Sequence, residues 1–191
     1  MEDWVQRALA RWPNVPALYG WLRLDRRGRW RIRGEVISRP QIIDAINRNY
    51  AADERGCWYF QNGPQRGYVS LDYTPLILRA CGDDDRLQTH TGLAVAAPES
   101  AWLDQEGSLL LNTAHGPGLL ADPDLPWALQ RLYVDDTTVN EDQLTAALAQ
   151  PAGARTPLQL RFGGQRLPLT RIDATEVSTH FGYVCDPQAD D

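Results

Sequence analysis

An internal repeat, in which matching residues stand 102 positions apart, is the feature of this sequence that most constrains its fold. The matches surround two segments with the apolar spacing of an amphipathic helix, each opened by a capping residue with a glutamine three positions later. They are Ser38 and Asn140, Gln41 and Gln143, Ile42 and Leu144, Ala45 and Ala147, and Ile46 and Leu148. Phe60 and Phe162 keep the same spacing, so we expect the two halves of the chain to fold alike.

Alternating apolar and polar residues on both sides of each predicted helix indicate strands that form hairpins. Residues 20–33 and 101–111 read as one hairpin in each half, and the turns GPQR (63–66) and GGQR (163–166) close another. The predicted fold is therefore α+β: two internally repeated ββαββ units with antiparallel sheets, plus an N-terminal helix that ends before Pro13. A closed, barrel-like arrangement of the two sheets is the alternative.

The two repeats divide the chain into two predicted parts that form one compact unit. Residues 1–85 hold the N-terminal helix and the first repeat, and residues 86–191 hold the second repeat with an insertion at about 112–136. The insertion contains HGPG (115–118), which has the composition of a flexible loop, with His115 at its mouth. Two interpretations of the insertion stay open: a binding loop or lid, and a segment without a function of its own.

The stretch WYFQNGPQR (58–66) runs three aromatic residues into a turn that is followed by Gln65 and Arg66. It is either a hairpin that both halves need or a site that presents Gln65 and Arg66 to a ligand, since arginine binds carboxylate and phosphate groups well. With its flanks, CWYFQNGPQRGYVSLDYTPLILR (57–79) resembles the signature stretch of an uncharacterised family of proteobacterial cytosolic proteins that has no assigned activity. The resemblance implies a bacterial source, and no catalytic residue can be carried over from it.

All 19 basic residues are arginines, and they are unevenly distributed. Residues 1–80 hold 13 arginines and eight acidic residues, a net charge of +5, whereas residues 81–191 hold six arginines and 17 acidic residues, a net charge of −11. Four arginines in the predicted strands of the first hairpin stand at odd-numbered positions: Arg23, Arg29, Arg31 and Arg33. Apolar residues occupy even-numbered positions of the same hairpin: Leu22, Leu24, Trp30 and Ile32. A regular hairpin would place the arginines on one face, which either binds a partner or is covered by the acidic half or a second subunit.

Composition and motifs disfavour several classes of protein. No apolar run reaches the roughly 20 residues that a membrane helix needs, and the acidic N-terminus lacks the pattern of a signal peptide. Three widely spaced cysteines without a CxxC motif indicate neither a zinc site nor disulfides, so we predict a cytoplasmic protein without a metal or other cofactor. The GxSxG, HExxH, P-loop and GxGxxG motifs are absent, which disfavours the common hydrolases, metalloproteases and nucleotide-binding enzymes.

Three functions fit these observations. The first is a non-enzymatic cytosolic binding or protein-interaction module that binds a protein partner, or a second copy of itself, through the arginine face. The second is a small-molecule-binding protein or enzyme with a site between the two repeats, closed by His115 and reached by Arg66 or Arg166. The third is nucleic-acid binding through the first hairpin, which the acidic overall charge makes unfavourable. His180 and Cys185 are either a reactive Cys–His pair or a structural histidine beside a buried thiol.

Overall fold

The structure, a computed structural model, describes residues 16–189, so the predicted N-terminal helix lies outside the described residues. The described chain forms two compact units: unit 1 contains residues 16–75 and 182–189, and unit 2 contains residues 76–181. Strands hold 43% of the described residues and helices hold 17%. The fold is therefore mostly β, and the prediction of an α+β fold is wrong.

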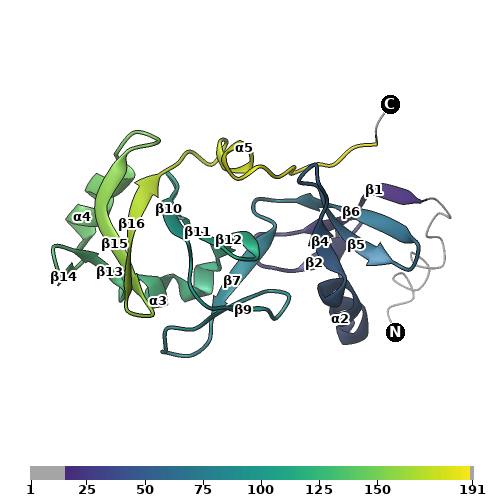
Figure 1. The fold of residues 1–191 in the computed structure, drawn as a ribbon, viewed down its shortest axis with the longest axis horizontal. Helices are drawn as coiled ribbons and strands as arrows, with labels where there is room; N and C mark the ends of the chain where they lie inside the picture. Colours follow the sequence, from purple (N-terminus) through teal and green to yellow (C-terminus); the bar gives the residue numbers. More distant parts are fainter. Residues whose placement is uncertain (1–15, 190–191) are drawn as a thin grey trace. The chain divides into compact units, whose positions relative to one another are not determined.

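Unit 1 is a six-stranded sheet with one helix among its described residues (Figure 1). Its elements are β1 (Ala17–Leu24), β2 (Trp30–Ile32), β3 (Glu35–Val36), α2 (Pro40–Arg48), β4 (Tyr50–Ala52), β5 (Trp58–Asn62) and β6 (Gln65–Leu71). The strand order is β3-β2-β1-β6-β5-β4. α2 lies on the side of the sheet where Leu22 and Ile32 are buried, and its own Ile46 is buried there as well.

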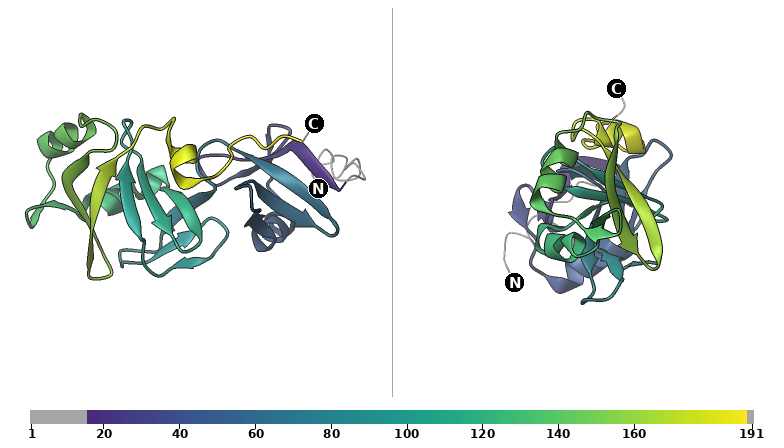
Figure 2. Two further views of the ribbon diagram at one scale, coloured as in Figure 1. Left: turned by 45° about the horizontal axis from the view of Figure 1, so that its top comes forward. Right: turned by 90° about the vertical axis from the view of Figure 1, so that its left-hand side faces the viewer.

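Unit 2 is a ten-stranded sheet with helices packed against it. Its strands are β7 (Leu76–Ala80), β8 (Leu87–Thr89), β9 (Ala94–Val95), β10 (Ser100–Leu103), β11 (Leu109–Thr113), β12 (Gly116–Leu120), β13 (Leu132–Val134), β14 (Thr137–Thr138), β15 (Arg155–Phe162) and β16 (Gln165–Arg171). Its helices are the 3-10 helix η1 (Asp122–Asp124), α3 (Leu125–Leu129), α4 (Glu141–Leu148) and α5 (Val177–Phe181). The order is β14-β13-β15-β16-β10-β11-β12-β7-β8-β9, and α4 packs on the core through Leu144 and Leu148. Figure 2 shows the ribbon from two further directions.

The predicted ββαββ repeat with antiparallel sheets is wrong for a reason that the two units share. Each helix-bearing segment begins with three strands, because a second turn follows the first hairpin: Arg33 and Gly34 adopt φ values of 51° and 88° and lead into β3. In unit 2, β12 follows β11 in the same way. The first and last strands then pair in parallel, β1 with β6 and β10 with β16, so both sheets are mixed. Both strand orders end in edge strands, so the closed barrel is not formed by the described residues either.

The two helices of the predicted repeat begin differently. α4 has the predicted capping box: the Asn140 side chain accepts a hydrogen bond from the Gln143 backbone N–H at 2.9 Å, and the Gln143 side chain accepts one from the Asn140 N–H at 3.0 Å. α2 begins at Pro40 with Arg39 as N-cap, so the predicted Ser38 cap is wrong. Proline starts a helix well because its φ is already helical and its missing N–H is not needed there.

The segment predicted as an insertion, 112–136, is part of the sheet and core of unit 2. Gly116–Leu120 is β12, which pairs with β11 on one side and with β7 on the other, so residues 115–118 are not a flexible loop. A Cβ atom on Gly118 would lie 2.7 Å from Cγ of Leu78. The glycine therefore serves the close approach of two strands, and its presence in the sequence does not indicate mobility.

Candidate functional site

The sheet of unit 1 carries arginine and aromatic side chains on the face opposite its apolar core. In the β1–β2 hairpin, Arg23 lies directly opposite Arg31, and Leu22 lies opposite Ile32. Leu22 and Ile32 are buried, as the alternation in the sequence predicts. We call the other side the arginine–aromatic face; it consists of Tyr19, Trp21, Arg23, Arg31, Tyr59, Arg66 and Tyr68, with Arg29 and Arg33 added from adjoining turns.

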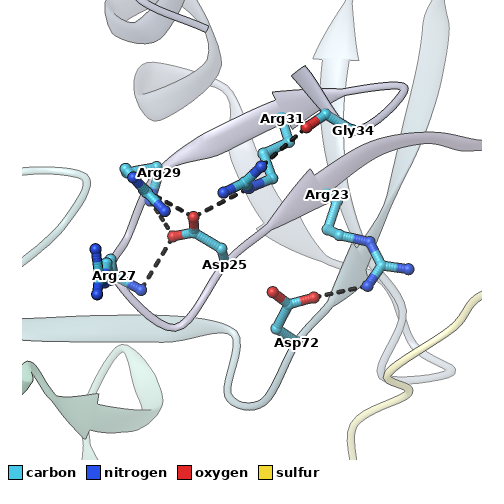
Figure 3. A network of polar contacts seen from close by, with 7 residues as sticks. All are labelled: Arg23, Asp25, Arg27, Arg29, Arg31, Gly34 and Asp72. Carbon is cyan, nitrogen blue, oxygen red and sulfur yellow. Dashed lines mark hydrogen bonds and ion pairs between the residues drawn. The ribbon is translucent and has the colours of Figure 1, made fainter. Parts of the chain in front are cut away.

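A buried carboxylate fixes two of these arginines (Figure 3). Asp25, which is only 5% exposed, accepts backbone hydrogen bonds from Arg27 and Arg29 on Oδ1, at 3.0 and 2.9 Å. Its Oδ2 binds Nε of Arg29 at 2.8 Å and Nε of Arg31 at 3.1 Å. Arg31 also donates from Nη1 to the Gly34 carbonyl at 2.9 Å. Both guanidinium groups are thus held by their Nε atoms, which leaves terminal nitrogens of each available to a further acceptor.

The turn that places Asp25 is used three times between residues 16 and 189. In each case an aspartate accepts hydrogen bonds from the backbone N–H groups two and four residues later, and a glycine three residues later has a positive φ. The three turns are Asp25–Gly28, Asp53–Gly56 and Asp104–Gly107. The first of them adds two arginine side chains on the second carboxylate oxygen, and this converts a turn element into an anchor for cations.

Replacing Asp25 by asparagine is expected to destabilise unit 1 by about 1–3 kcal/mol at neutral pH, because a neutral amide pairs poorly with two guanidinium groups. Burial acts to raise the pKa of Asp25, but hydrogen bonds from the backbone and side chain of Arg29 and from Arg31 outweigh it and hold the pKa below its ordinary value of 3.8. The carboxylate therefore contributes stability above pH 3.8 that is lost as the pH falls through its folded-state pKa. Urea unfolding of both proteins across this range measures the difference, which should shrink in acid; a difference independent of pH would contradict an ionic role for Asp25.

Two more arginines of the first hairpin are held by other partners. Arg23 donates from Nη1 to Oδ1 of Asp72 at 2.7 Å, and its side chain is 54% exposed (Figure 3). The guanidinium carbon of Arg33 lies 3.7 Å from the ring centre of Trp21, within the range of a cation–π contact. All four arginines that the sequence predicted for this face are therefore ordered by a specific neighbour.

An open, polar hollow of about 540 Å³ lies at the β4–β5–β6 end of the same unit. The guanidinium carbon of Arg66 lies 4.5 Å from the ring centre of Tyr59, and hydrogen bonding to Tyr68 raises the pKa of Arg66. The Tyr68 hydroxyl donates to Oδ2 of Asp53 at 3.1 Å, and Arg55 pairs with the same oxygen at 3.5 Å. This end therefore places Arg55 and Arg66 near aromatic rings, but Asp53 and Glu54 line the same hollow, so its charge is mixed.

The remaining residues that the sequence predicted for a site lie elsewhere. Gln65 begins β6 opposite Asn62, which confirms that WYFQNGPQR is the β5–β6 hairpin. His115 lies in the β11–β12 turn of unit 2, where Nε2 is 2.9 Å from the Ala94 carbonyl. Arg166, also in unit 2, pairs with Asp136 at 2.8 Å. His115 and Arg166 share no hydrogen bond or ion pair within the described part of unit 2, so the structure gives them separate structural partners.

Sequence reasoning missed two kinds of residue in this face. Tyr59 and Tyr68 are not singled out by the sequence analysis, although they stand opposite each other across the β5–β6 hairpin. Asp25 is not singled out within the predicted hairpin of residues 20–33 either. The signal that identifies Asp25 is the spacing of aspartate and glycine, which recurs in three hairpins, together with arginines four and six residues after the aspartate.

Between residues 16 and 189, no helix is both long enough and apolar enough to cross a bilayer. The same residues contain no group of three or more histidine, cysteine, aspartate or glutamate side chains placed to hold a metal ion.

The fold is that of a mostly β protein of two units, one of which carries a cationic sheet face. The chain belongs to the family DUF2944, whose description reads "Protein of unknown function (DUF2946)" and whose model matches residues 1–188. No curated protein matches this sequence.

The fold is similar to that of a crystal structure of a DUF1285 family protein from Silicibacter pomeroyi, with a TM-score of 0.55 and 16% sequence identity over 83% of each chain. A DUF1285 family protein from Shewanella baltica gives a TM-score of 0.41 and 14% identity, over 54% of this chain and 85% of that one. At this identity the first likeness concerns the fold alone. The resemblance to a family without an assigned activity is thus confirmed, and the proteobacterial source stays a prediction.

Proposed function

We propose that the chain is a non-enzymatic, cytosolic bacterial binding module, whose arginine–aromatic face binds an acidic segment of a protein partner. The observation that carries this proposal is the Asp25 carboxylate, which holds Arg29 and Arg31 side by side while their side chains stay 43% and 28% exposed. Cations that are ordered before binding lose less conformational freedom when they meet a carboxylate. Arginine also offers two parallel N–H groups to each carboxylate, which favours acidic side chains as ligands.

The distribution of charge between the units supports an acidic ligand for unit 1. The described residues of unit 1 hold 10 arginines and seven acidic residues, a net charge of +3, whereas unit 2 holds seven arginines and 14 acidic residues, a net charge of −7. The acidic overall charge of the chain therefore does not describe the surface of unit 1. A positive patch of this kind attracts acidic partners over distances of about 10 Å at moderate salt.

Nucleic acid is the second candidate, because arginines beside aromatic rings also bind single strands. The geometry favours a protein partner, since the rings already have neighbours over their faces. Arg33 lies over Trp21, Arg66 lies over Tyr59, and Tyr19 stacks on Tyr68 with ring centres 4.6 Å apart and an angle of 2° between the planes. The face therefore presents guanidinium groups, and bases would have to displace these contacts in order to stack.

Reversing the charge of Arg29 and Arg31 to glutamate is expected to weaken binding of a fluorescent polyglutamate peptide by about tenfold or more, because two ordered cations become anions. The measurement is fluorescence anisotropy at low and moderate salt. The matched control reverses two exposed arginines of unit 2, Arg86 and Arg155, which changes the net charge equally. Circular dichroism of each variant tests whether the fold is kept.

The outcomes separate the candidates. Equal loss in both double variants would show attraction by net charge alone and would contradict a specific face. A wild-type protein that binds polyglutamine as well as polyglutamate would also overturn the proposal. Binding of an oligothymidine strand in preference to the peptide, lost on reversal of Arg29 and Arg31, would favour the nucleic-acid candidate.

A further inference from the structure

Unit 2 contains a cavity that lies outside the arginine–aromatic face and that none of the functions above uses. Its volume is about 450 Å³, within the range of roughly 300–1,000 Å³ that is usual for small-molecule sites. One strand pair, the loop after α4 and the helix α5 supply its walls. The lining residues are Trp102, Gly153, Thr170, Arg171, Ile172, Thr175, Glu176, Thr179 and His180.

The local folding explains why these side chains converge. Trp102 of β10 stands directly opposite Thr170 of β16, so both lie on the same side of the sheet. Glu176, Thr179 and His180 follow one another at the spacing of three and four residues that places side chains on one face of a helix, and the His180 N–H binds the Glu176 carbonyl at 2.8 Å. Val177 of the same helix is buried. The His180 ring meets the Trp102 ring with centres 4.3 Å apart, so the aromatic wall is fixed.

The cavity is open, and its polar residues Thr175, Glu176 and Thr179 are exposed, so their side chains are available to a ligand. The hydroxyls of Thr170, Thr175 and Thr179 make no side-chain hydrogen bond with any residue between 16 and 189, and the Glu176 carboxylate makes no ion pair with a described residue. Hydroxyl groups both donate and accept, and a carboxylate accepts. A ligand that fills the cavity therefore meets three hydroxyls and one acceptor beside an aromatic wall.

The charge of the cavity restricts the class of ligand further. Arg171 lines the cavity, but its side chain is only 4% exposed and its donors bind backbone carbonyls and the Asp173 carboxylate. Glu176 is then the charge that faces a ligand, and it repels phosphates and carboxylates. A neutral molecule with several hydroxyls and an apolar face satisfies both the threonine hydroxyls and the Trp102 ring.

We infer that this cavity of unit 2 binds a neutral, polyhydroxylated ring such as a pyranose sugar. Its hydroxyls would donate to Glu176 and exchange hydrogen bonds with the threonines, and its C–H face would pack on Trp102. The inference is independent of the arginine–aromatic face, because all of its residues lie in unit 2.

The test titrates the full chain with glucose, mannose, galactose and N-acetylglucosamine and follows the Trp102 indole N–H signal by NMR. At least one sugar should shift that signal in a saturable way at millimolar concentration. Thr179→Val and Glu176→Gln should each weaken its binding by about three- to tenfold, the effect of one lost hydrogen bond. Thr145→Val, an exposed threonine on α4 in the same unit, is the matched control and should leave the affinity unchanged.

Three results would overturn the inference. The first is the absence of a saturable shift with any of the four sugars while the wild-type spectrum is that of a folded protein. The second is sugar binding that Thr179→Val and Glu176→Gln leave intact. The third is a preference for glucose 6-phosphate over glucose, since Glu176 should disfavour the phosphate.

Discussion

Replacing Arg171 by methionine is expected to lower the free energy of unfolding of unit 2 by about 3–5 kcal/mol, the usual cost of removing one partner from a buried charged network. Arg171 is 3% exposed. Its Nε donates to the carbonyls of Leu148 and Gln150 at the end of α4, and Nη1 donates to the carbonyl of Leu103 in β10. Methionine fills a similar volume but offers no donor, so the carbonyls of Leu148 and Gln150 would lose their side-chain donor and the carbonyl of Leu103 would keep only the Ile172 N–H. Urea unfolding followed by tryptophan fluorescence measures the loss.

The control for this variant is Arg155→Met, because Arg155 is an exposed arginine of β15 in the same unit and should cost less than about 0.5 kcal/mol. Arg171→Lys keeps the charge but not the fork of five donors, and it should fall between the two. Hydrogen exchange adds a local reading: the last turn of α4 should lose protection first in Arg171→Met. Equal stability of the Arg155 and Arg171 variants would show that the buried hydrogen bonds contribute nothing net.

Replacing Gly56 by alanine is expected to destabilise unit 1 by about 2–5 kcal/mol, for two reasons that act together. Gly56 has a φ of 77°, which a residue with a side chain adopts only at a cost. A Cβ atom would also lie 2.2 Å from the carbonyl oxygen of Gly182, a backbone atom that cannot turn aside. The backbone of residues 182–186 would have to move away, although the Val184 N–H binds the Gly56 carbonyl and the Leu71 N–H binds the Cys185 carbonyl.

Gly63→Ala separates the two reasons. Gly63 also has a positive φ, 57°, but no atom lies within 4 Å of where its Cβ would be placed. It should therefore cost about 1–2 kcal/mol, the strain of the backbone alone. Hydrogen exchange at Val184 and Leu71 is the second measurement, because Gly56→Ala should expose both amides and Gly63→Ala should expose neither. Similar losses in the two variants would mean that the C-terminal segment does not restrain Gly56.

The same local signal in the sequence predicted the start of one helix correctly and failed at the other. The capping box of Asn140 and Gln143 depends on two side chains within one turn, and it is present. The same pattern at Ser38 and Gln41 failed because Pro40 starts α2 one residue later, with Arg39 as the cap. The N-caps are therefore 101 residues apart, so the spacing of 102 residues was a match of composition and not of helix position.

The pairing of strands could not be predicted in the same way. β1 and β6 are separated by a helix and four other strands in the chain, and nothing in either segment specifies that they pair in parallel. The strands β3 and β12, which follow the first hairpin of each unit, were not predicted for a different reason. The turn of Arg33 and Gly34 has a positive φ at both residues, and such turns usually carry glycine, asparagine or aspartate at both positions. Arg33 is none of these, so only Gly34 marks the turn in the sequence.

The candidate site was predictable in part for the same physical reason. The alternation of side chains along a strand was enough to place Arg23 and Arg31 on one face, because it is a property of the backbone. This alternation does not show which groups hold the arginine side chains in place. Asp72 and Asp25 do so from different elements, and the contribution of Tyr59 depends on the register of β5 against β6.

Unit 1 is interrupted in the sequence by the whole of unit 2, and this sets the order in which a ribosome can complete it. Residues 182–189 emerge only after residues 76–181 have been synthesised, which takes about 5–20 s at usual rates of translation. During that interval the Gly56 carbonyl and the Leu71 N–H lack the Val184 and Cys185 groups that bind them in the finished protein. A nascent chain stalled inside unit 2 therefore carries an incomplete unit 1, which lacks the hydrogen bonds from residues 182–189.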